Sequence, residues 1–329
     1  TWVVMVTSGY NNVNAPNQAG DGVGYLYVVN ASTGQIIHKI PTGVGDATTP
    51  SGLAQINGYA DLAEVNNMTL RVYGTDVLGN VWRFDVNDTI APGGREATLL
   101  GTAKDSGGTA QPITIRPELS IRDGNPMVFV ATGKLLGATD VGDLQTQSVY
   151  GIVDPMTGSP SFANLRSALV PLGLTQVGSG PGTYRTVACT GTVAQCAAPD
   201  GWVVNLPDSG ERVNVEMKLR SGTLIVGSNV PQISACVSGG YSWLNFFNYR
   251  DGTAVPGGTA GGTGLGQQYS VSQQYANFLI VGITIVKLPG IGSKPKVYIT
   301  GSNSTIETVD LKYPPTDPKR VSWREISAQ

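Results

Sequence analysis

Residues 25–40 read YLYVVNASTGQIIHKI, and the pattern of this stretch indicates the fold class. An aromatic and β-branched run ends at Asn30, a short turn follows, and a second apolar run begins after Gly34. Asn at the first turn position can accept hydrogen bonds from backbone N–H groups, and Gly at the last position can take a positive φ. The stretch therefore predicts a β-hairpin.

The same hairpin signature recurs along the chain. Residues 150–158 read YGIVDPMTG and residues 243–252 read WLNFFNYRDG, so three copies fit the pattern Asn/Asp-x-x-Thr/Asp-Gly after an aromatic strand. Residues 81–85 and 306–310 are less exact copies, which end in Asp without the following Gly. The copies return at irregular intervals of more than 50 residues, which is typical of a propeller with loop insertions.

We therefore predict an all-β fold, a β-propeller of four-stranded blades with about five blade units visible in this chain. No linker divides the chain, so we expect one domain over residues 1–329, with insertions at 159–200 and 256–266. The first insertion has one short helical stretch, residues 162–169, before a loop rich in Gly, Ser and Thr. In residues 211–220, apolar and polar side chains alternate, which predicts a strand with one dry and one wet face.

The composition agrees with a turn-rich β protein. Only 13% of the residues are charged, against roughly 25% in an ordinary soluble domain, while 44 are Gly and 20 are Pro. With a net charge of −2 and no Lys/Arg cluster, we expect no nucleic-acid partner. The longest apolar run, residues 278–286, is too short to span a membrane and predicts a buried strand. Because the chain opens on an apolar run without Met, we expect it to belong to a longer protein.

Cys189 and Cys196 stand seven residues apart in a loop of small residues. We favour a local disulfide over two free thiols, and a disulfide implies an oxidising compartment. Cys236 is left over, either buried as a small apolar residue or paired outside this chain. A zinc site is disfavoured, because His38 is the only His and no second Cys pair exists.

The sequence offers no catalytic constellation. His38 lies within a predicted strand, where an ordinary strand side chain is a plainer interpretation than a general base, and no Gly-x-Ser-x-Gly elbow accompanies it. Paired carboxylates for glycoside hydrolysis stay open, because two such acids can lie far apart in the sequence. The Gly-rich run 262–266 lacks the strand and helix that flank a phosphate loop, so we interpret it as a linker. We predict no catalytic and no cofactor-binding residues.

All five tryptophans lie in strand-like runs, which favours packing within blades over a platform for sugars. They are Trp2, Trp82, Trp202, Trp243 and Trp323.

Eleven short motifs occur in an order that resembles a known family. They are SGYNN (8–12), GYLYVVN (24–30), PSGLA (50–54), DVLGNVWRFD (76–85), QPIT (111–114), TGK (132–134), QSVY (147–150), GW (201–202), GERV (210–213), GYSWL (240–244) and SWRE (322–325). Together they resemble the C-terminal domain of the PilY/PilC family, the tip-associated biogenesis factors and adhesins of bacterial type IV pili. The resemblance covers essentially the whole chain. It implies a modified seven-bladed β-propeller on a secreted protein, with the N-terminal blades outside this chain.

Calcium-regulated members of the family carry an Asp-rich loop before the strand that leads into the Gly-Asn-[Leu/Val]-Trp motif. The matching stretch in this sequence, residues 61–72, keeps Glu64 and Asn66 as oxygen donors, but apolar residues occupy alternate positions where ligands are needed. Two oxygens do not make a site of six to eight ligands, so we predict no metal site and no cofactor. Asp21 and residues 11–17 also offer oxygens, and calcium there is the alternative to an ordinary solvated loop, which we favour because the EF-hand spacing is missing.

The resemblance implies a non-enzymatic protein associated with the tip of a type IV pilus, where it promotes pilus assembly, extension and surface adhesion. Its expected partners are minor pilins and a host or abiotic surface receptor. The expected location is outside a Gram-negative cell, at the cell surface or pilus tip. Two alternatives stay open: a quinoprotein-type propeller dehydrogenase, whose repeat residues 28–39 loosely resemble, and a lectin-like secreted adhesin not tied to pili.

Overall fold

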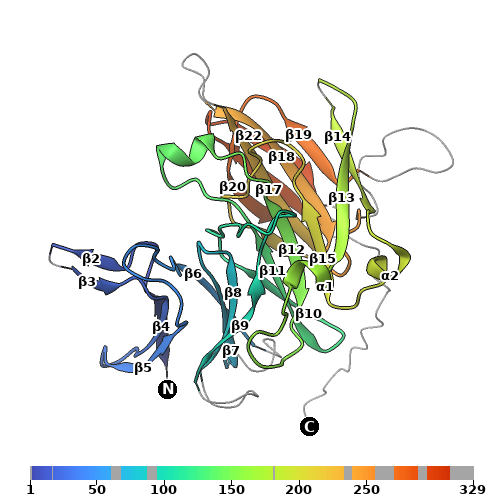
Figure 1. Ribbon diagram of the computed structural model, residues 1–329. Coiled ribbons are helices and arrows are strands. Elements are labelled where there is room, and N and C mark those ends of the chain that lie inside the picture. The colour runs from blue at the N-terminus through green and yellow to red at the C-terminus, as the bar shows by residue number, and fades with distance from the viewer. Residues whose placement is uncertain are drawn as a thin grey trace, which may run out of the picture.

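The computed structural model describes residues 2–16, 18–60, 68–86, 95–180, 182–232, 239–255, 270–287 and 295–311 (Figure 1). These residues form a succession of antiparallel sheets, which we name blades A to E in chain order. The predicted all-β propeller with five blade units is confirmed. Residues 256–266, like Glu64, Asn66, Cys236 and Trp323, lie outside the described residues.

Within each blade, strands that pair side by side follow one another in chain order. Blade A contains β1 (Val3–Thr7), β4 (Tyr25–Asn30) and β5 (Ile36–Pro41). Blade B contains β6 (Gln55–Tyr59), β7 (Arg71–Thr75), β8 (Asn80–Asp85) and β9 (Ala97–Thr102). Blade C contains β10 (Glu118–Arg122), β11 (Asn125–Ala131), β12 (Ser148–Val153) and β15 (Gly201–Asn205). Blade D contains β16 (Lys218–Arg220), β17 (Thr223–Gln232), β18 (Gly239–Asn248) and β19 (Ser272–Tyr275). Blade E contains β20 (Ile280–Val286), β21 (Lys296–Gly301) and β22 (Ile306–Asp310).

Two hairpins are inserted into this plan, as Figure 1 shows. The first, β2 (Val13–Ala15) and β3 (Gln18–Asp21), projects from blade A between β1 and β4. The second, β13 (Val170–Val177) and β14 (Tyr184–Cys189), lies between the outer strands of blades C and D. The helical elements are short: the 3-10 helix η1 (Ala138–Gly142), α1 (Leu165–Ala168) and α2 (Val193–Cys196).

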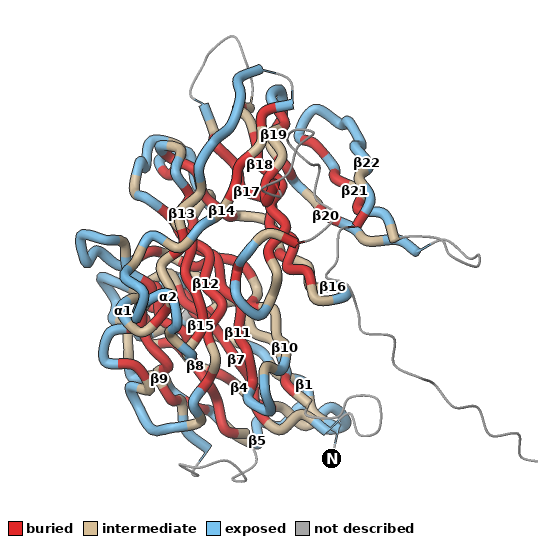
Figure 2. Tube along the Cα trace, turned by 90° about the vertical axis from the view of Figure 1, so that its right-hand side faces the viewer, coloured by how far each residue is buried: buried red, intermediate tan, exposed pale blue. Residues whose placement is uncertain are grey.

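The alternation of side chains along each strand builds the seams between blades. In β11, Met127 and Phe129 pack into an apolar cluster shared with blade D, while Val128 and Val130 pack into a cluster shared with blade B. Further clusters fill the seams between A and B and between D and E. Successive side chains point to opposite faces, so a blade between two others must be apolar on both faces. Figure 2 shows the result, with buried residues along the blades and exposed residues in the connections.

The predicted hairpin turns are present. The side-chain oxygen of Asn30 accepts hydrogen bonds from the N–H groups of Ser32 and Thr33, and Asn248 accepts one from Arg250. Gly34 has φ +72° and Gly252 φ +71°, as the pattern requires. The copy at 150–158 differs, because there Met156 takes the positive φ of +56°.

The second hairpin fuses two blades into one sheet. β13 pairs in parallel with β15 of blade C, and β14 pairs antiparallel with β19 of blade D. The ten strands run in the order β10-β11-β12-β15-β13-β14-β19-β18-β17-β16. The short helix expected within 162–169 is present as α1, but the hairpin in the 159–200 insertion was not predicted.

Two strand predictions need correction. Of residues 211–220, only Lys218–Arg220 form a strand, and Arg212, predicted on the wet face, is buried. In β20, Val281 is 56% exposed, so this strand buries one face rather than both.

Trp82, Trp202 and Trp243 are buried within blades, as predicted. The ring of Trp202 lies 5.6 Å from that of Phe247, centroid to centroid, in the seam between blades C and D. Trp2 departs from the prediction, because it is 88% exposed.

Candidate functional site

An open cavity of about 330 Å³ lies on blade A, beside the β2–β3 hairpin, and we call it the blade-A corner. Its lining includes Asn12, Asn14, Asp21, Tyr25, Tyr27 and Lys39.

Strand pairing places the aromatic and basic groups of the corner together. Tyr25 and Tyr27 alternate with the buried Leu26 along β4, so both rings point away from the A–B seam. Lys39 on β5 stands opposite Tyr27. Its Nζ lies 3.9 Å from the centroid of the Tyr25 ring and 5.8 Å from that of Tyr27, which is a cation–π arrangement.

Asp21 fixes the position of Tyr25, one of the two tyrosines that line the corner. The hydroxyl of Tyr25 donates to Asp21 Oδ2 at 2.5 Å, and Asp21 Oδ1 accepts from Val23 N at 3.0 Å and from Asn12 Nδ2 at 3.4 Å. The pKa of Asp21 is lowered below its usual value, mainly by the hydrogen bond from the Tyr25 hydroxyl and to a smaller extent by the one from the Val23 N–H. The same carboxylate raises the pKa of Tyr25 to about 12. Both oxygens of Asp21 are thus engaged within the corner.

The base of the β2–β3 hairpin is fixed by close backbone contacts. Gly22 has φ +81°, and its N–H donates to the carbonyl of Asn12 at 2.5 Å. A Cβ atom at this position would lie 1.8 Å from the carbonyl oxygen of Asp46, so only glycine fits. Asn12 Nδ2 also donates to the carbonyl of Val23 at 2.9 Å. The hairpin beside the corner is therefore fixed against the blade.

The junction of blades C and D contains a buried charge network. Arg185 on β14 makes two hydrogen bonds of 2.9 Å to the carboxylate of Glu211, and both side chains are fully buried. It also pairs with Asp208 at 2.8 Å, and its guanidinium lies 3.7 Å from the ring of Trp243. Ser228 Oγ donates to Glu211 at 2.6 Å. These contacts attach the inserted hairpin to blade D, so we assign them a structural role.

Arg212 secures the loop that contains η1. Its guanidinium donates to the backbone carbonyls of Gly210, Lys134, Asp140 and Asp143. Burial is the main cause that lowers the pKa of Arg212 below its usual value. One arginine thus joins the β11–β12 connection to the segment that precedes blade D.

A second buried ion pair crosses the seam between blades B and C. Arg83 NH1 lies 2.7 Å from Asp154 Oδ1, and the Tyr73 hydroxyl donates to Asp154 Oδ2 at 2.7 Å. Arg83 NH2 also donates to the carbonyl of Thr157 at 2.8 Å. Asp154 therefore does more than close its turn, where it accepts from the N–H of Met156.

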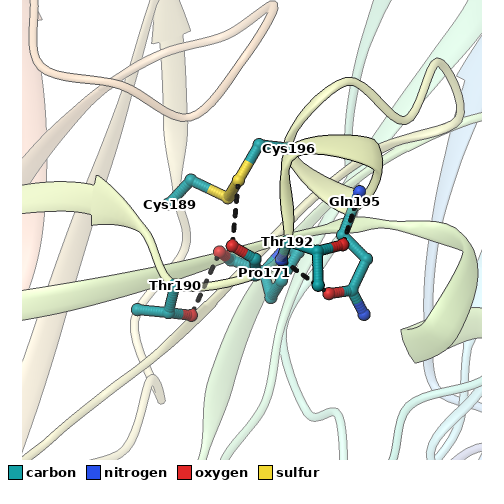
Figure 3. The surroundings of a disulfide bond; sticks show 7 residues. Pro171, Cys189, Thr190, Thr192, Gln195 and Cys196 are labelled. Carbon is teal, nitrogen blue, oxygen red and sulfur yellow. Dashed lines mark hydrogen bonds between the residues drawn. A yellow bond between two sulfur atoms is a disulfide. The ribbon is translucent and has the colours of Figure 1, made fainter.

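Cys189 and Cys196 form a disulfide, with Cα atoms 5.9 Å apart. The bond joins the end of β14 to α2, as Figure 3 shows. Thr192 caps α2 by accepting from Gln195 N, while Gln195 Oε1 accepts from Thr192 N, and Thr190 donates to the Pro171 carbonyl. The disulfide and these hydrogen bonds close the outer end of the inserted hairpin.

The remaining predicted positions do not assemble into a site. His38 is an ordinary side chain of β5. The family calcium loop with Glu64 and Asn66 falls outside the described residues. Within the part of the chain that the structure describes, no group of three or more His, Cys, Asp or Glu side chains could hold a metal ion.

Of the blade-A corner, the sequence indicated only the oxygens of Asp21 and residues 11–17, and the Arg185 network was not predicted. The alternation of Tyr25 and Tyr27 with apolar residues was a visible signal for one polar-aromatic face on that strand. Arg185 gave no signal, because its partners lie 23 to 26 residues further along the chain, and a charged residue in a polar segment predicts exposure.

No helix among the described residues is long and apolar enough to cross a membrane.

The fold is that of a β-propeller with an inserted hairpin that fuses two of its blades. Residues 1–168 match the family model described as the PilY1 beta-propeller domain. The chain therefore belongs to the PilY1 beta-propeller family.

Curated relatives of the chain include two proteins of Xylella fastidiosa, each named type IV pilus biogenesis factor PilY1 homolog. One is 28% identical over 279 residues, covering 78% of this chain and 18% of the relative, and the other is 28% identical over 349 residues, covering 99% and 25%. Type IV pilus biogenesis factor PilY1 of Pseudomonas aeruginosa is 24% identical over 303 residues, covering 75% of this chain and 25% of the relative. The chain thus spans a quarter or less of the length of these relatives.

The crystal structure of the P. aeruginosa PilY1 C-terminal domain has the same fold. It superposes with a TM-score of 0.70 at 18% identity, covering 94% of this chain and 69% of that one. This likeness supports the propeller assignment beyond residue 168.

Proposed function

We propose that this chain is the propeller region of a non-enzymatic type IV pilus biogenesis factor, which acts at the pilus tip. There it promotes pilus assembly and extension and mediates adhesion, with minor pilins and a host or abiotic surface as partners. The family match over residues 1–168 is the observation that carries the proposal, and the names of the three curated relatives supply the pilus role.

The described residues support a scaffold. Two buried ion pairs lie at the boundaries between blades, Arg83–Asp154 and Arg185–Glu211. Buried ion pairs fix the geometry of their surroundings more than they add net stability. A protein that holds partners at the end of a filament needs such fixed geometry, and connections at the ends of the blades leave room for contacts with them.

The disulfide agrees with the proposed location. Disulfides persist in the periplasm and at cell surfaces and are rare in the reducing cytosol. Cys189–Cys196 therefore suits a protein secreted by a Gram-negative bacterium. We further propose that blades A to E belong to one domain of a longer secreted protein.

Immunogold labelling of intact piliated cells tests the proposal. We expect gold at filament tips or where pili emerge, and we expect deletion of the encoding gene to reduce the number of surface pili. Complementation with the full-length protein should restore them, and the purified protein should show no visible chromophore of a bound quinone. Label confined to the periplasm, together with normal piliation in the deletion strain, would contradict the proposal and favour the dehydrogenase.

A further inference from the structure

The inserted hairpin leaves one strand edge open. β13 pairs with β15 only over Val170–Leu172, and β15 ends at Asn205. Pro207, two residues further on, has no N–H with which to continue the pairing. The hairpin extends past this point (Figure 1), so residues 173–177 pair with β14 on one side and with no described strand on the other. We call residues 173–177 the open edge of β13.

The register of the hairpin determines which backbone groups the open edge presents. Thr190 N–H donates to the carbonyl of Pro171 at 2.9 Å, and an antiparallel strand bonds the same neighbour at every second residue. The carbonyl of Leu174 and both backbone groups of Gln176 therefore point away from β14. Residues 175–177 are exposed, so a partner can reach these groups.

The open edge lies between two blades that are both present. The hairpin joins blade C to blade D, and one apolar cluster fills the seam between them, from Phe129 of blade C to Phe247 of blade D. In a ring of blades, further blades would pack against the outward faces of blades A and E. The open edge of β13 is on neither of these faces.

The outer strands of the other described blades are charged or covered. Natural proteins protect exposed strand edges with charged residues, Pro or a covering segment. β5 of blade A carries Lys39, and β22 of blade E carries Glu307 and Asp310. Residues 159–162 run beside β9 of blade B, where Ser161 N–H donates to a β9 carbonyl at 2.9 Å. The open edge of β13 reads GLTQV and has none of these protections.

The insertion that contains the open edge is nearly free of charge. Residues 167–199 include one charged side chain, Arg185, which is buried and paired with Glu211. An acidic or basic partner strand would lose hydration there without gaining a counter-charge. Leu174 packs against the apolar cluster of the C–D seam, so an apolar side chain beside it would extend that cluster. The edge therefore fits an uncharged strand.

A second copy of the chain fits this edge poorly. Two open edges paired antiparallel about Thr175 would bring Gly178 of one copy beside Leu172 of the other. That position is already occupied, because Leu172 pairs with Val204 of β15. A separate strand has no such restriction, because it needs to lie only beside residues 173–177.

We propose that the open edge of β13 binds an extended, uncharged strand of another protein, which adds to the ten-stranded sheet of blades C and D. In strand addition, main-chain hydrogen bonds supply affinity and alternate side chains supply specificity. The N–H and carbonyl of Gln176 and the carbonyl of Leu174 make these bonds. The inference goes beyond the pilus role and does not depend on it.

Hydrogen exchange of the full-length protein, resolved to single residues by mass spectrometry, tests whether the edge is open. We expect the Gln176 amide to exchange about tenfold or more faster than the amides of Thr175 and Val177, which bond to β14. A Gln176 amide that exchanges as slowly as these two would mean that another part of the protein covers the edge, and would overturn the inference.

A phage library of random linear peptides, panned on the immobilised full-length protein, tests the chemistry of the partner. We expect the retained peptides to be uncharged and rich in β-branched and aromatic residues. One such peptide, made synthetically, should slow the exchange of the Gln176 amide about tenfold or more. Charged peptides, no enrichment, or unchanged exchange at Gln176 would overturn the inference.

Two variants and a control assign the binding to the open edge. Gln176→Pro removes the outward N–H and leaves the bonds between β13 and β14 in place, while Gln176→Lys puts a charge on the edge. Each should weaken binding of the synthetic peptide about tenfold or more, with an unchanged far-ultraviolet circular dichroism spectrum. Ala188→Lys puts the same charge on an exposed residue of β14, in the same hairpin but away from the edge, and should leave binding unchanged. Full binding by the Gln176 variants, an equal loss in Ala188→Lys, or wild-type dimers that Gln176→Pro dissociates would overturn the inference.

Discussion

Replacing Arg185 by Met tests the structure of the C–D junction most directly. Arg185 and Glu211 are both fully buried and joined by two hydrogen bonds of 2.9 Å. The substitution leaves the Glu211 carboxylate in the junction with only the Ser228 hydroxyl and the Asp208 N–H as donors among the described residues. Removing one partner of a buried ion pair costs about 3–5 kcal/mol, because the other charge stays desolvated. The contact with the ring of Trp243 is lost as well.

Urea unfolding measures this change. Trp243 and Trp202 are both buried at the junction, so tryptophan fluorescence reports on its opening. We expect the free energy of unfolding of the Arg185→Met protein to fall by about 3–5 kcal/mol. Arg250→Met is the matched control, because Arg250 pairs with Asp123 on the surface, where a pair contributes about 0–1 kcal/mol.

A double variant separates a stranded charge from lost packing. In Arg185→Met/Glu211→Met the desolvated carboxylate is gone as well, and replacing both partners of a buried pair by apolar groups is often neutral. We therefore expect the double variant to regain most of the lost stability. A loss below about 1 kcal/mol in Arg185→Met, or a double variant weaker than the single one, would show that the pair does not act as a buried charge couple.

Three other contacts give expectations of the same kind. Cys189→Ser opens a loop with a sequence separation of seven and should lower the free energy of unfolding by about 2.5 kcal/mol, measured by urea unfolding. An unchanged urea midpoint would show that the hydrogen bonds around α2 alone close the hairpin. Asp76→Ala removes the buried acceptor of the backbone N–H groups of Leu78 and Asn80 and of the indole N–H of Trp82, and should lower the free energy of unfolding by about 3–5 kcal/mol in the same assay. A decrease smaller than that of Cys189→Ser would contradict this role of Asp76. The pKa of Asp21 is lowered below its usual value of 3.8, so its hydrogen bond with Tyr25 is kept above pH 3.8 and is lost only as the pH falls through the lower folded pKa. Carboxyl ¹³C NMR of Asp21 measures this pKa directly. Replacing Tyr25 by Phe should move the pKa of Asp21 up toward 3.8.

The repeating part of the fold was readable because its signal is local. Asn30, Asp154 and Asn248 close their turns within three residues, and each precedes or follows strands with clear apolar alternation. Such local signals identify a hairpin, and their recurrence identifies a propeller.

The inserted hairpin was missed because nothing local requires it. Residues 170–177 and 184–189 include Gly, Pro, Thr and Gln, so their alternation is weak. Their pairing depends on outer strands of two different blades, β15 and β19, which the chain reaches only later. The same distance hid the environment of Glu211, whose burial depends on an arginine 26 residues earlier in the sequence.

The polar contacts at the seams also explain how similar blades keep their order. Apolar strands of similar length could pack against any neighbour, but the seams from blade B to blade E each have different polar groups. The seam between B and C contains the Arg83–Asp154 pair, and the junction of C and D contains Arg185–Glu211. Between D and E, the amide of Asn229 donates to the Ile280 carbonyl and accepts from its N–H. A blade docked on the wrong neighbour would bury these groups without partners, at a cost of about 1–3 kcal/mol for each neutral group and more for each charge. We infer that the seams use polar contacts to select one blade order, while the apolar clusters supply the stability.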